Sequence, residues 1–186
     1  METRECIKSR RSVRNFTGQE IPEETLSELL EAVRWSPSWA NSQCWELVVV
    51  KDRATKEKLA ELLAERNPAT KAVVQAPLVV VFCGKKGLAG YKKGMPMTQK
   101  GDWYMFDVGL ACQNFCLAAH DLGLGTVQVG NFDHQGVDKL LNITGDVESV
   151  AIIPVGYPAK DSQAPPRKEI RDFVYLESYG NKMTRD

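Results

Sequence analysis

Residues 77–83 read P-L-V-V-V-F-C, and residues 107–125 read D-V-G-L-A-C-Q-N-F-C-L-A-A-H-D-L-G-L-G. The first stretch is a short, continuous apolar run, which predicts a buried strand. The second is apolar on most sides at helical spacing, so residues 102–122 are expected to form a helix that is buried in one core or between two subunits. A loop rich in Gly and Lys, residues 84–101, joins the two. The strand and the helix therefore form the centre of the predicted fold.

Further helices and strands are expected on both sides of this centre. Helices are expected at residues 2–9, from Ile21 to Pro37, after the capping residue Asp52, and from Asp133. Strands are expected at residues 46–51, 126–130, 149–157 and 173–176. Helices and strands mixed in this order indicate an α/β or α+β sheet flanked by helices. A chain of 186 residues fits one compact domain more easily than two.

The composition argues against several classes of protein. The 24 basic and 24 acidic residues give a formal net charge of zero, and the pI is near 6.7. A nucleic-acid partner is therefore not expected, since such proteins normally carry an excess of basic residues. The five cysteines form no Cys-x-x-Cys pair and only two histidines are present, so no metal site is expected. The sequence shows neither a signal peptide nor a membrane span, and we expect a cytoplasmic protein.

Two basic segments are candidates for binding an anion. Residues 9–14 read S-R-R-S-V-R, and residues 165–168 read P-P-R-K. Guanidinium groups match the geometry of phosphate, and serine adds a neutral donor. Taken singly, the first segment is equally well a solvated basic turn and the second a stiff polar linker. If the fold brings them together, they form a clamp for one dianionic phosphate.

Two other segments are candidates for contacting a ligand. Residues 36–45, S-P-S-W-A-N-S-Q-C-W, combine turn-forming residues with amide side chains and two indoles. Residues 123–130, G-L-G-T-V-Q-V-G, differ from a dinucleotide fingerprint because they follow a helix and open a strand. Gly130 would instead allow a ligand to approach backbone N–H groups. Motifs of hydrolases, metalloproteases and phosphate loops are missing, which favours chemistry carried by a cofactor.

Five segments together resemble the nitroreductase family of FMN-dependent oxidoreductases. They are R-R-S-V-R-N-F at 10–16, the segment at 36–45, the segment at 107–125, V-G-N-F-D at 129–133, and I-P-V-G-Y-P with P-P-R-K within 153–168. The resemblance implies an α+β fold with a mixed, mostly antiparallel central sheet flanked by helices. It further implies a single FMN-binding domain over residues 1–186 and an intertwined homodimer with two FMN sites at the subunit interface.

The resemblance also assigns roles to residues of the two basic segments. Arg10 and Ser12, with Arg11 beside them, match positions that hold the FMN phosphate and ribityl chain. Arg167 and Lys168 match a basic pair that closes on the same phosphate.

Three further groups match positions around the flavin ring. Arg14 matches a basic residue near the pyrimidine edge, where a cation stabilises the charge left by reduction. Val129 and Gly130 match a segment whose backbone N–H groups meet the flavin. Pro37, Ser38 and Asn41 match a loop that reaches the flavin from the other subunit. No role is assigned to Asn67 and Lys71, where the local match is poor.

The resemblance implies transfer of hydride from NADH or NADPH to FMN, followed by reduction of a nitroaromatic, quinone or related small-molecule acceptor, with no catalytic side chain. The loop at 85–101, with Tyr91, Trp103, Tyr104 and Phe106 nearby, is either the wall facing the acceptor or a solvated lysine loop. Flavin fragmentation, reductive dehalogenation and azoline oxidation are alternatives within the family. A non-catalytic flavin-binding protein and a thiol sensor using Cys112 and Cys116 are alternatives from other classes.

Overall fold

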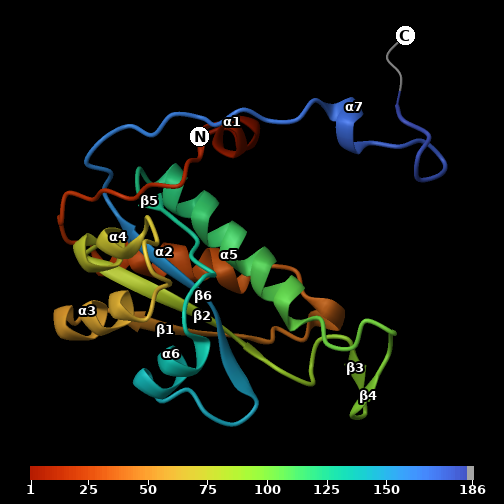
Figure 1. Cartoon of the computed structure of the whole chain (residues 1–186), viewed down its shortest axis with the longest axis horizontal. Coiled ribbons are helices and arrows are strands. Elements are labelled where there is room, and N and C mark those ends of the chain that lie inside the picture. The colour runs from red at the N-terminus through yellow and green to blue at the C-terminus, as the bar shows by residue number, and fades with distance from the viewer. Residues whose placement is uncertain (184–186) are drawn as a thin grey trace.

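Strand β2 (Leu78–Lys85) lies inside a four-stranded sheet in the computed structural model, which describes residues 1–183 (Figure 1). It pairs with β1 (Trp45–Val50) and with β6 (Val147–Gly156), and β6 also pairs with the short β5 (Gly125–Thr126). These three pairings are antiparallel, and one parallel bridge joins Ser12 to Thr126. The expected α+β class with a mostly antiparallel sheet is confirmed.

Both faces of β2 are covered, which explains why residues 78–83 are apolar at every position. Alternate side chains point into two separate cores, and each of these six side chains is at most 2% exposed: Leu78, Val80 and Phe82 in one core, and Val79, Val81 and Cys83 in the other. Helices α2 (Glu23–Arg34) and α5 (Tyr104–Asp121) cover the first face. The second face is covered by α3 (Arg53–Glu61), α4 (Thr70–Gln75) and α6 (His134–Leu140).

The strongest helix predictions are confirmed. Helix α5 buries small side chains and Phe115 against the sheet, as its apolar sequence indicated. The carboxylates of Asp52 and Asp133 cap α3 and α6 by accepting backbone N–H bonds from Thr55 and Gly136. Helix α1 (Thr3–Ser9) lies at the expected N-terminal position. None of the helices within residues 1–183 combines the length and apolar character that crossing a membrane requires.

Two expected strands differ from the structure. The strand expected at 126–130 is limited to β5, after which Val129 makes a single bridge to Ile152. The strand expected at 173–176 is wrong, because α7 (Ile170–Phe173) ends there and Tyr175 makes only one bridge, to Lys182. This segment lies apart from the sheet (Figure 1), so its apolar residues have no neighbouring strand with which to pair.

Besides α7, four short elements were not predicted. They are α4, a 3₁₀ turn η1 (Trp39–Asn41), and a hairpin of β3 (Tyr91–Lys92) and β4 (Met95–Pro96) inside the expected loop. Each is too short to produce a readable hydrophobic period.

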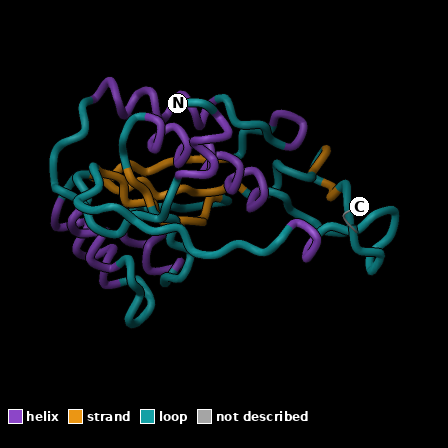
Figure 2. Tube along the Cα trace, turned by 90° about the horizontal axis from the view of Figure 1, so that it is seen from above, coloured by secondary structure: helices purple, strands orange, loops and turns teal. Residues whose placement is uncertain are grey.

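The chain after β6 forms a long C-terminal segment, residues 159–183, that leaves the body of the molecule. Figures 1 and 2, seen from directions 90° apart, both show its end projecting away from the sheet and helices. The segment carries large apolar side chains that are exposed in the single chain: Ile170 57%, Phe173 57%, Leu176 46% and Tyr179 90%. An apolar surface of this kind is typical of a segment that packs on another protein chain.

Candidate functional site

The two basic segments identified in the sequence meet at one pocket. Arg10, Arg11, Ser12 and Arg14 line a cavity of about 160 Å³ together with Arg167, and Gln163 and Pro165 complete its wall. Four arginines and one serine therefore border a common space, although they come from opposite ends of the sequence. We call this cavity the arginine pocket. Lys168 is not among the residues that line it.

The N-terminal half of the arginine pocket is held against the edge of the sheet. The N–H of Val13 donates to the carbonyl oxygen of Thr126 at 2.9 Å, beside the bridge between Ser12 and Thr126. A Cβ added at Gly125 would come within 2.6 Å of the Val13 side chain, so glycine is needed for this close approach. The local backbone thus fixes where residues 10–14 lie.

The C-terminal half reaches the pocket because the chain leaves β6 beside the N-terminal segment. The N–H of Thr17 donates to the carbonyl of Tyr157, and the N–H of Ala159 donates to the carbonyl of Asn15, both at 3.0 Å. These two bonds align residues 157–159 with residues 15–17. They account for the return of residues 163–167 to the arginine pocket.

The positive charge of the arginine pocket is not offset by acids. No Asp or Glu lines it, and none of its four arginines forms an ion pair with any residue in the described part of the chain. The guanidinium of Arg11 donates to the carbonyls of Lys8 and Arg10 at 2.6 and 2.8 Å. A dianionic phosphate group is the ligand chemistry that this arrangement fits best.

A histidine next to the arginine pocket responds to its charge. Nε2 of His120 lies 2.7 Å from the hydroxyl of Ser9, the residue before Arg10. Burial lowers the pKa of His120, and the charges of Arg10 and Arg11 lower this pKa further, while Asp121 acts in the opposite direction. Burial and the two cations thus act together to disfavour a positive charge on His120.

A second cavity adjoins the arginine pocket, and Arg14 lines both. Its volume is about 160 Å³, and its other walls are Asn67, Pro68, Ala69 and residues 127–131. The N–H of Val129 donates to the carbonyl of Ile152 at 3.0 Å and is therefore not available to a ligand. The N–H of Gly130 has no partner among residues 1–183, and no atom lies within 4 Å of where its Cβ would be. Gly130 thus provides the accessible donor.

Asn67 lies in this cavity although sequence reasoning assigned it no role. Its side-chain Nδ2 donates to the carbonyl of Asn131 at 3.2 Å, which ties the turn before α4 to the cavity wall. Asn67 falls near further flavin contacts of the family, but the local match is too poor to assign it a role from the sequence. Lys71, the other unassigned residue, lines neither cavity.

The third predicted group, Pro37, Ser38 and Asn41, lines neither of these two cavities. Pro37 and Ser38 precede η1 and Asn41 ends it. The N–H of Trp39 in η1 donates to both carboxylate oxygens of Asp107 at 3.1 and 3.0 Å. Asp107 is in the first turn of α5, whereas His120, beside the arginine pocket, is in its last turn. About 20 Å of helix separates the two positions. Within one chain the structure does not bring this group to the arginine pocket.

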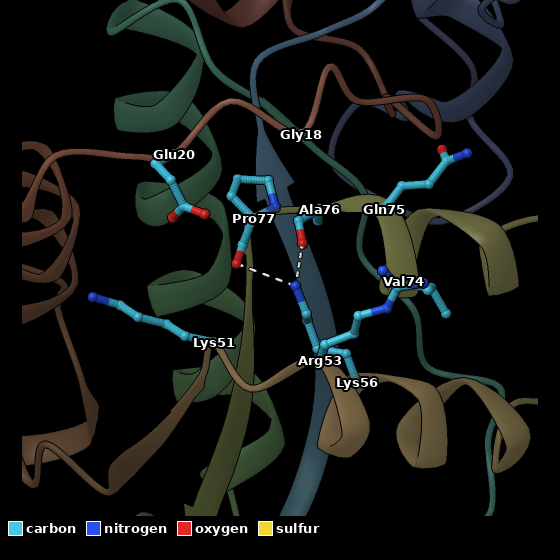
Figure 3. A pocket seen from close by; sticks show the side chains of 9 residues that line it. All are labelled: Gly18, Glu20, Lys51, Arg53, Lys56, Val74, Gln75, Ala76 and Pro77. Carbon is cyan, nitrogen blue, oxygen red and sulfur yellow. Dashed lines mark hydrogen bonds between the residues drawn. The ribbon is translucent and has the colours of Figure 1, made fainter.

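A larger cavity of about 470 Å³ lies between α3, α4 and the loop before α2 (Figure 3). The ammonium of Lys56, a residue only 6% exposed, donates to the carbonyls of Ala76 and Pro77 at 2.7 and 3.3 Å. Burial lowers the pKa of Lys56. The other cations at this cavity, Lys51 and Arg53, are paired with glutamates. Lys56 therefore anchors the end of α4 through these carbonyls. Lys51 and Arg53 are already neutralised by their glutamate partners.

The two cysteines of α5 lack the features of reactive thiols. Cys112 and Cys116 are 2% and 1% exposed, and burial raises the pKa of both thiols. Redox-sensing cysteines need an accessible thiol with a lowered pKa. The geometry therefore favours a packing role for this pair over a thiol sensor.

Comparison with known proteins places nearly the whole chain within one set of relatives. A model of the nitroreductase family matches residues 7–157. A relative from Methanothermobacter thermautotrophicus, provisionally named NADH dehydrogenase/NAD(P)H nitroreductase, is 34% identical over 96% of this chain and 88% of its own length. The FMN reductase [NAD(P)H] of Bacillus subtilis is 30% identical over 96% of this chain and 76% of its own length.

The fold of this chain is similar to that of a solved structure. Two further relatives are named for reactions other than nitro reduction. The structure of a nitroreductase family protein from Clostridium novyi NT is 27% identical with a TM-score of 0.77, covering 98% of this chain and 97% of that one. A 5,6-dimethylbenzimidazole synthase from Rhodospirillum rubrum is 30% identical over 84% of this chain and 82% of its own length. An iodotyrosine deiodinase from Thermotoga neapolitana is 29% identical over 89% of this chain and 94% of its own length.

Proposed function

The chain belongs to the nitroreductase family and is an NAD(P)H-dependent flavin oxidoreductase, and we propose that it passes electron pairs to nitroaromatic, quinone or related electrophilic acceptors through bound FMN. The observation that carries this proposal is the convergence of Arg10, Ser12 and Arg167 on one cavity without an acidic side chain. In the proposed ping-pong scheme NAD(P)H and the acceptor use the same flavin face in turn. No side chain then has to act as acid, base or nucleophile.

FMN supplies the hydride-accepting chemistry when it is bound, and the residues of this chain bind and orient it. Arg10, Ser12 and Arg167 hold the phosphate, with Arg11 beside them and Lys168 next to Arg167. The negative charge of the phosphate offsets the positive charge of the arginine pocket. The hydrogen bonds between the guanidinium groups and the phosphate are then charge-assisted.

The cavity that adjoins the arginine pocket accepts the flavin ring in this proposal. Arg14 lines both cavities, so its cation lies where it can offset the negative charge that reduction leaves on the ring. The free N–H of Gly130 donates to the ring edge, while Val129 contributes its side chain to the wall.

A second copy of the chain completes the site in this proposal. Pro37, Ser38 and Asn41 are too far from the arginine pocket to act there within one protomer, and the C-terminal segment exposes apolar side chains that need a partner. A two-fold homodimer satisfies both requirements at once, because each protomer then offers η1 to its partner's flavin and receives the same contact in return.

An anaerobic titration of the FMN-loaded protein tests the proposal. NADH or NADPH is expected to bleach the flavin absorbance, and adding an acceptor is expected to restore it. A quinone takes up one electron pair per molecule, and a nitroaromatic takes up one pair to reach the nitroso level and a second to reach the hydroxylamine. Initial rates at several acceptor concentrations should give parallel double-reciprocal lines. Protein that takes up no FMN, or whose flavin neither nicotinamide reduces, would contradict the proposal; the second result fits a non-catalytic flavin-binding protein.

A different reaction on the same flavin is the second candidate, and the relatives named as a dehalogenating enzyme and a benzimidazole synthase favour it. Reductive dehalogenation, flavin fragmentation and azoline oxidation are separated by their products. Reduced protein would release halide from a halogenated phenol in the first case. Flavin would be consumed stoichiometrically under oxygen in the second, and an azoline would be oxidised in the third. Catalytic turnover of nitroaromatics and quinones with intact flavin would exclude all three as the main activity.

A further inference from the structure

Residues 85–101 form a cationic segment in a protein of zero net charge. The segment holds five lysines and no Asp or Glu: Lys85, Lys86, Lys92, Lys93 and Lys100. Lys86 pairs with Glu148 at 2.9 Å. The other four are exposed and form no ion pair with any residue of the described chain. Unpaired cations gathered in this way attract an anion.

The hairpin of β3 and β4 fixes two of these lysines at its tip. Lys92 lies opposite Met95 in the pairing of the two strands, so both side chains share one face. The connecting residues Lys93 and Gly94 have φ of 52° and 76°, the positive values typical of a tight two-residue hairpin turn. The tip is thus an ordered turn carrying two cations and an exposed methionine.

The hairpin is attached to an aromatic cluster at the start of α5. The N–H of Trp103 donates to the carbonyl of Ala89 at 3.0 Å, and its indole N–H donates to the hydroxyl of Thr98 at 3.0 Å. A Cβ on Gly90 would meet the Trp103 ring at 2.5 Å. The base of the hairpin therefore lies directly on this indole.

Trp103 in turn joins the hairpin to η1. Its ring centroid lies 5.3 Å from that of Trp39 in η1 and 5.6 Å from that of Phe106, a side chain that is 57% exposed. Residues 37–41 and the lysine hairpin thus form one contiguous unit, at the end of α5 away from α1 (Figure 1). Whichever flavin residues 37–41 reach, the hairpin and its aromatic cluster lie beside it.

We propose that this unit makes the enzyme selective for acceptors that are both aromatic and anionic, such as aromatic carboxylates. The acceptor ring packs on Trp103 and Phe106, and its anionic group is met by Lys92 and Lys93. This inference rests on the proposed function, since it concerns the acceptor of the same flavin site.

Two acceptors of nearly equal shape test the charge preference. The kcat/KM of the FMN-loaded enzyme, with NADH as reductant, is compared for 4-nitrobenzoate and for the neutral 4-nitrobenzamide. We expect the wild type to prefer the anion, and added salt to reduce the preference by screening. Replacing Lys92→Gln and Lys93→Gln together should lower the ratio of the two kcat/KM values by about tenfold. The control Lys58→Gln, on an exposed position of α3, should leave the ratio unchanged.

Each other outcome overturns the inference. Equal kcat/KM values for the two acceptors in the wild type, or a ratio that the double variant leaves unchanged, would remove the role of the hairpin lysines. A double variant that changes only the preference for NADPH over NADH would assign the lysines to the nicotinamide's phosphate instead. Reduction of the flavin by NADH, monitored without acceptor, separates these results from a failure of the proposed function itself.

Discussion

At the scale of single residues, the proposed flavin site depends most on Arg10 and Arg167. We predict that Arg10→Ala or Arg167→Ala weakens FMN binding by about 10- to 100-fold, because a charge-assisted hydrogen bond to phosphate is lost. Calorimetric titration of the flavin-free protein measures this effect. Riboflavin, which lacks the phosphate, should bind the variants and the wild type alike, and Arg53→Ala serves as a control on α3. Unchanged FMN affinity in both variants would contradict the assignment.

His120 reports the charge in the arginine pocket. A bound phosphate offsets Arg10 and Arg11, so the pKa of His120 should rise from its lowered value when FMN or inorganic phosphate binds. A ligand that raises a pKa binds more tightly to the protonated form. Protonation of His120 should therefore favour phosphate binding, whereas protonation of the phosphate itself, whose second pKa is about 6, opposes it; the pKa of His120 is thus the quantity to measure.

Histidine ring signals followed by NMR across a pH series measure this effect. His134, whose Nδ1 lies 2.8 Å from the carbonyl oxygen of Ser149 in another part of the fold, is the internal control. A pKa of His120 that phosphate leaves unchanged would contradict the prediction.

The arginine pocket shows what a sequence can reveal about single residues. The guanidinium groups of residues 10–14 and 167 are recognisable as a phosphate clamp because their chemistry is specific, yet their convergence depends on backbone bonds between residues 15–17 and 157–159. Asn67 and Gln163 are isolated polar residues without a pattern. The N–H of Val129 is taken by Ile152, and only the register at the sheet edge decides this.

At the scale of secondary structure elements, Asp107 holds η1 on α5. This residue is 1% exposed and accepts hydrogen bonds from the Trp39 N–H and the Ser42 hydroxyl, the latter at 3.2 Å. Asp107→Ala should lower the free energy of unfolding by about 2–3 kcal/mol, because partly buried donors lose their charged, buried acceptor. Urea denaturation measures the loss. An effect no larger than that of the exposed control Asp121→Ala would show that η1 is held in another way.

The buried cysteines of α5 provide a prediction against the thiol-sensor alternative. Replacing Cys112 and Cys116 by Ala together should leave the rate of flavin reduction by NAD(P)H within about twofold, because the thiols lie in the core and do not line either cavity. Stopped-flow absorbance measures this rate, with circular dichroism to confirm folding. Loss of reduction in a folded variant that still binds FMN would restore a redox role for the pair.

Elements with strong local signals were predictable, and those that depend on neighbours were not. Strand β2 and helix α5 are buried on most sides and so have apolar residues at nearly every position, while Asp52 and Asp133 cap helices by chemistry visible in the sequence. Residues 173–176 carry strand-forming side chains, but no strand lies beside them. Residues 127–131 keep only one bridge to the sheet edge after β5, between Val129 and Ile152, and line a cavity instead of extending the ladder.

At the scale of the whole molecule, we predict a dimer that dissociates together with its flavin. A second chain would cover the exposed apolar side chains of the C-terminal segment and would bring η1 to the proposed flavin site. Light scattering should give twice the mass of one chain, and on dilution the loss of dimer should coincide with release of FMN, followed by its fluorescence. A monomer that retains FMN would contradict the shared site. No pattern within a single chain shows this arrangement, and only the family resemblance pointed to it.

The central claim is that two segments from opposite ends of the chain hold one FMN phosphate. A crystal structure of the protein grown with FMN tests it most directly. The account predicts phosphate oxygens within hydrogen-bond distance of Arg10, Ser12 and Arg167 of one protomer, with the flavin ring between Gly130 and residues 37–41 of its partner. A phosphate bound elsewhere, for example in the cavity beside Lys56, with Arg10 and Arg167 in solvent, would contradict it.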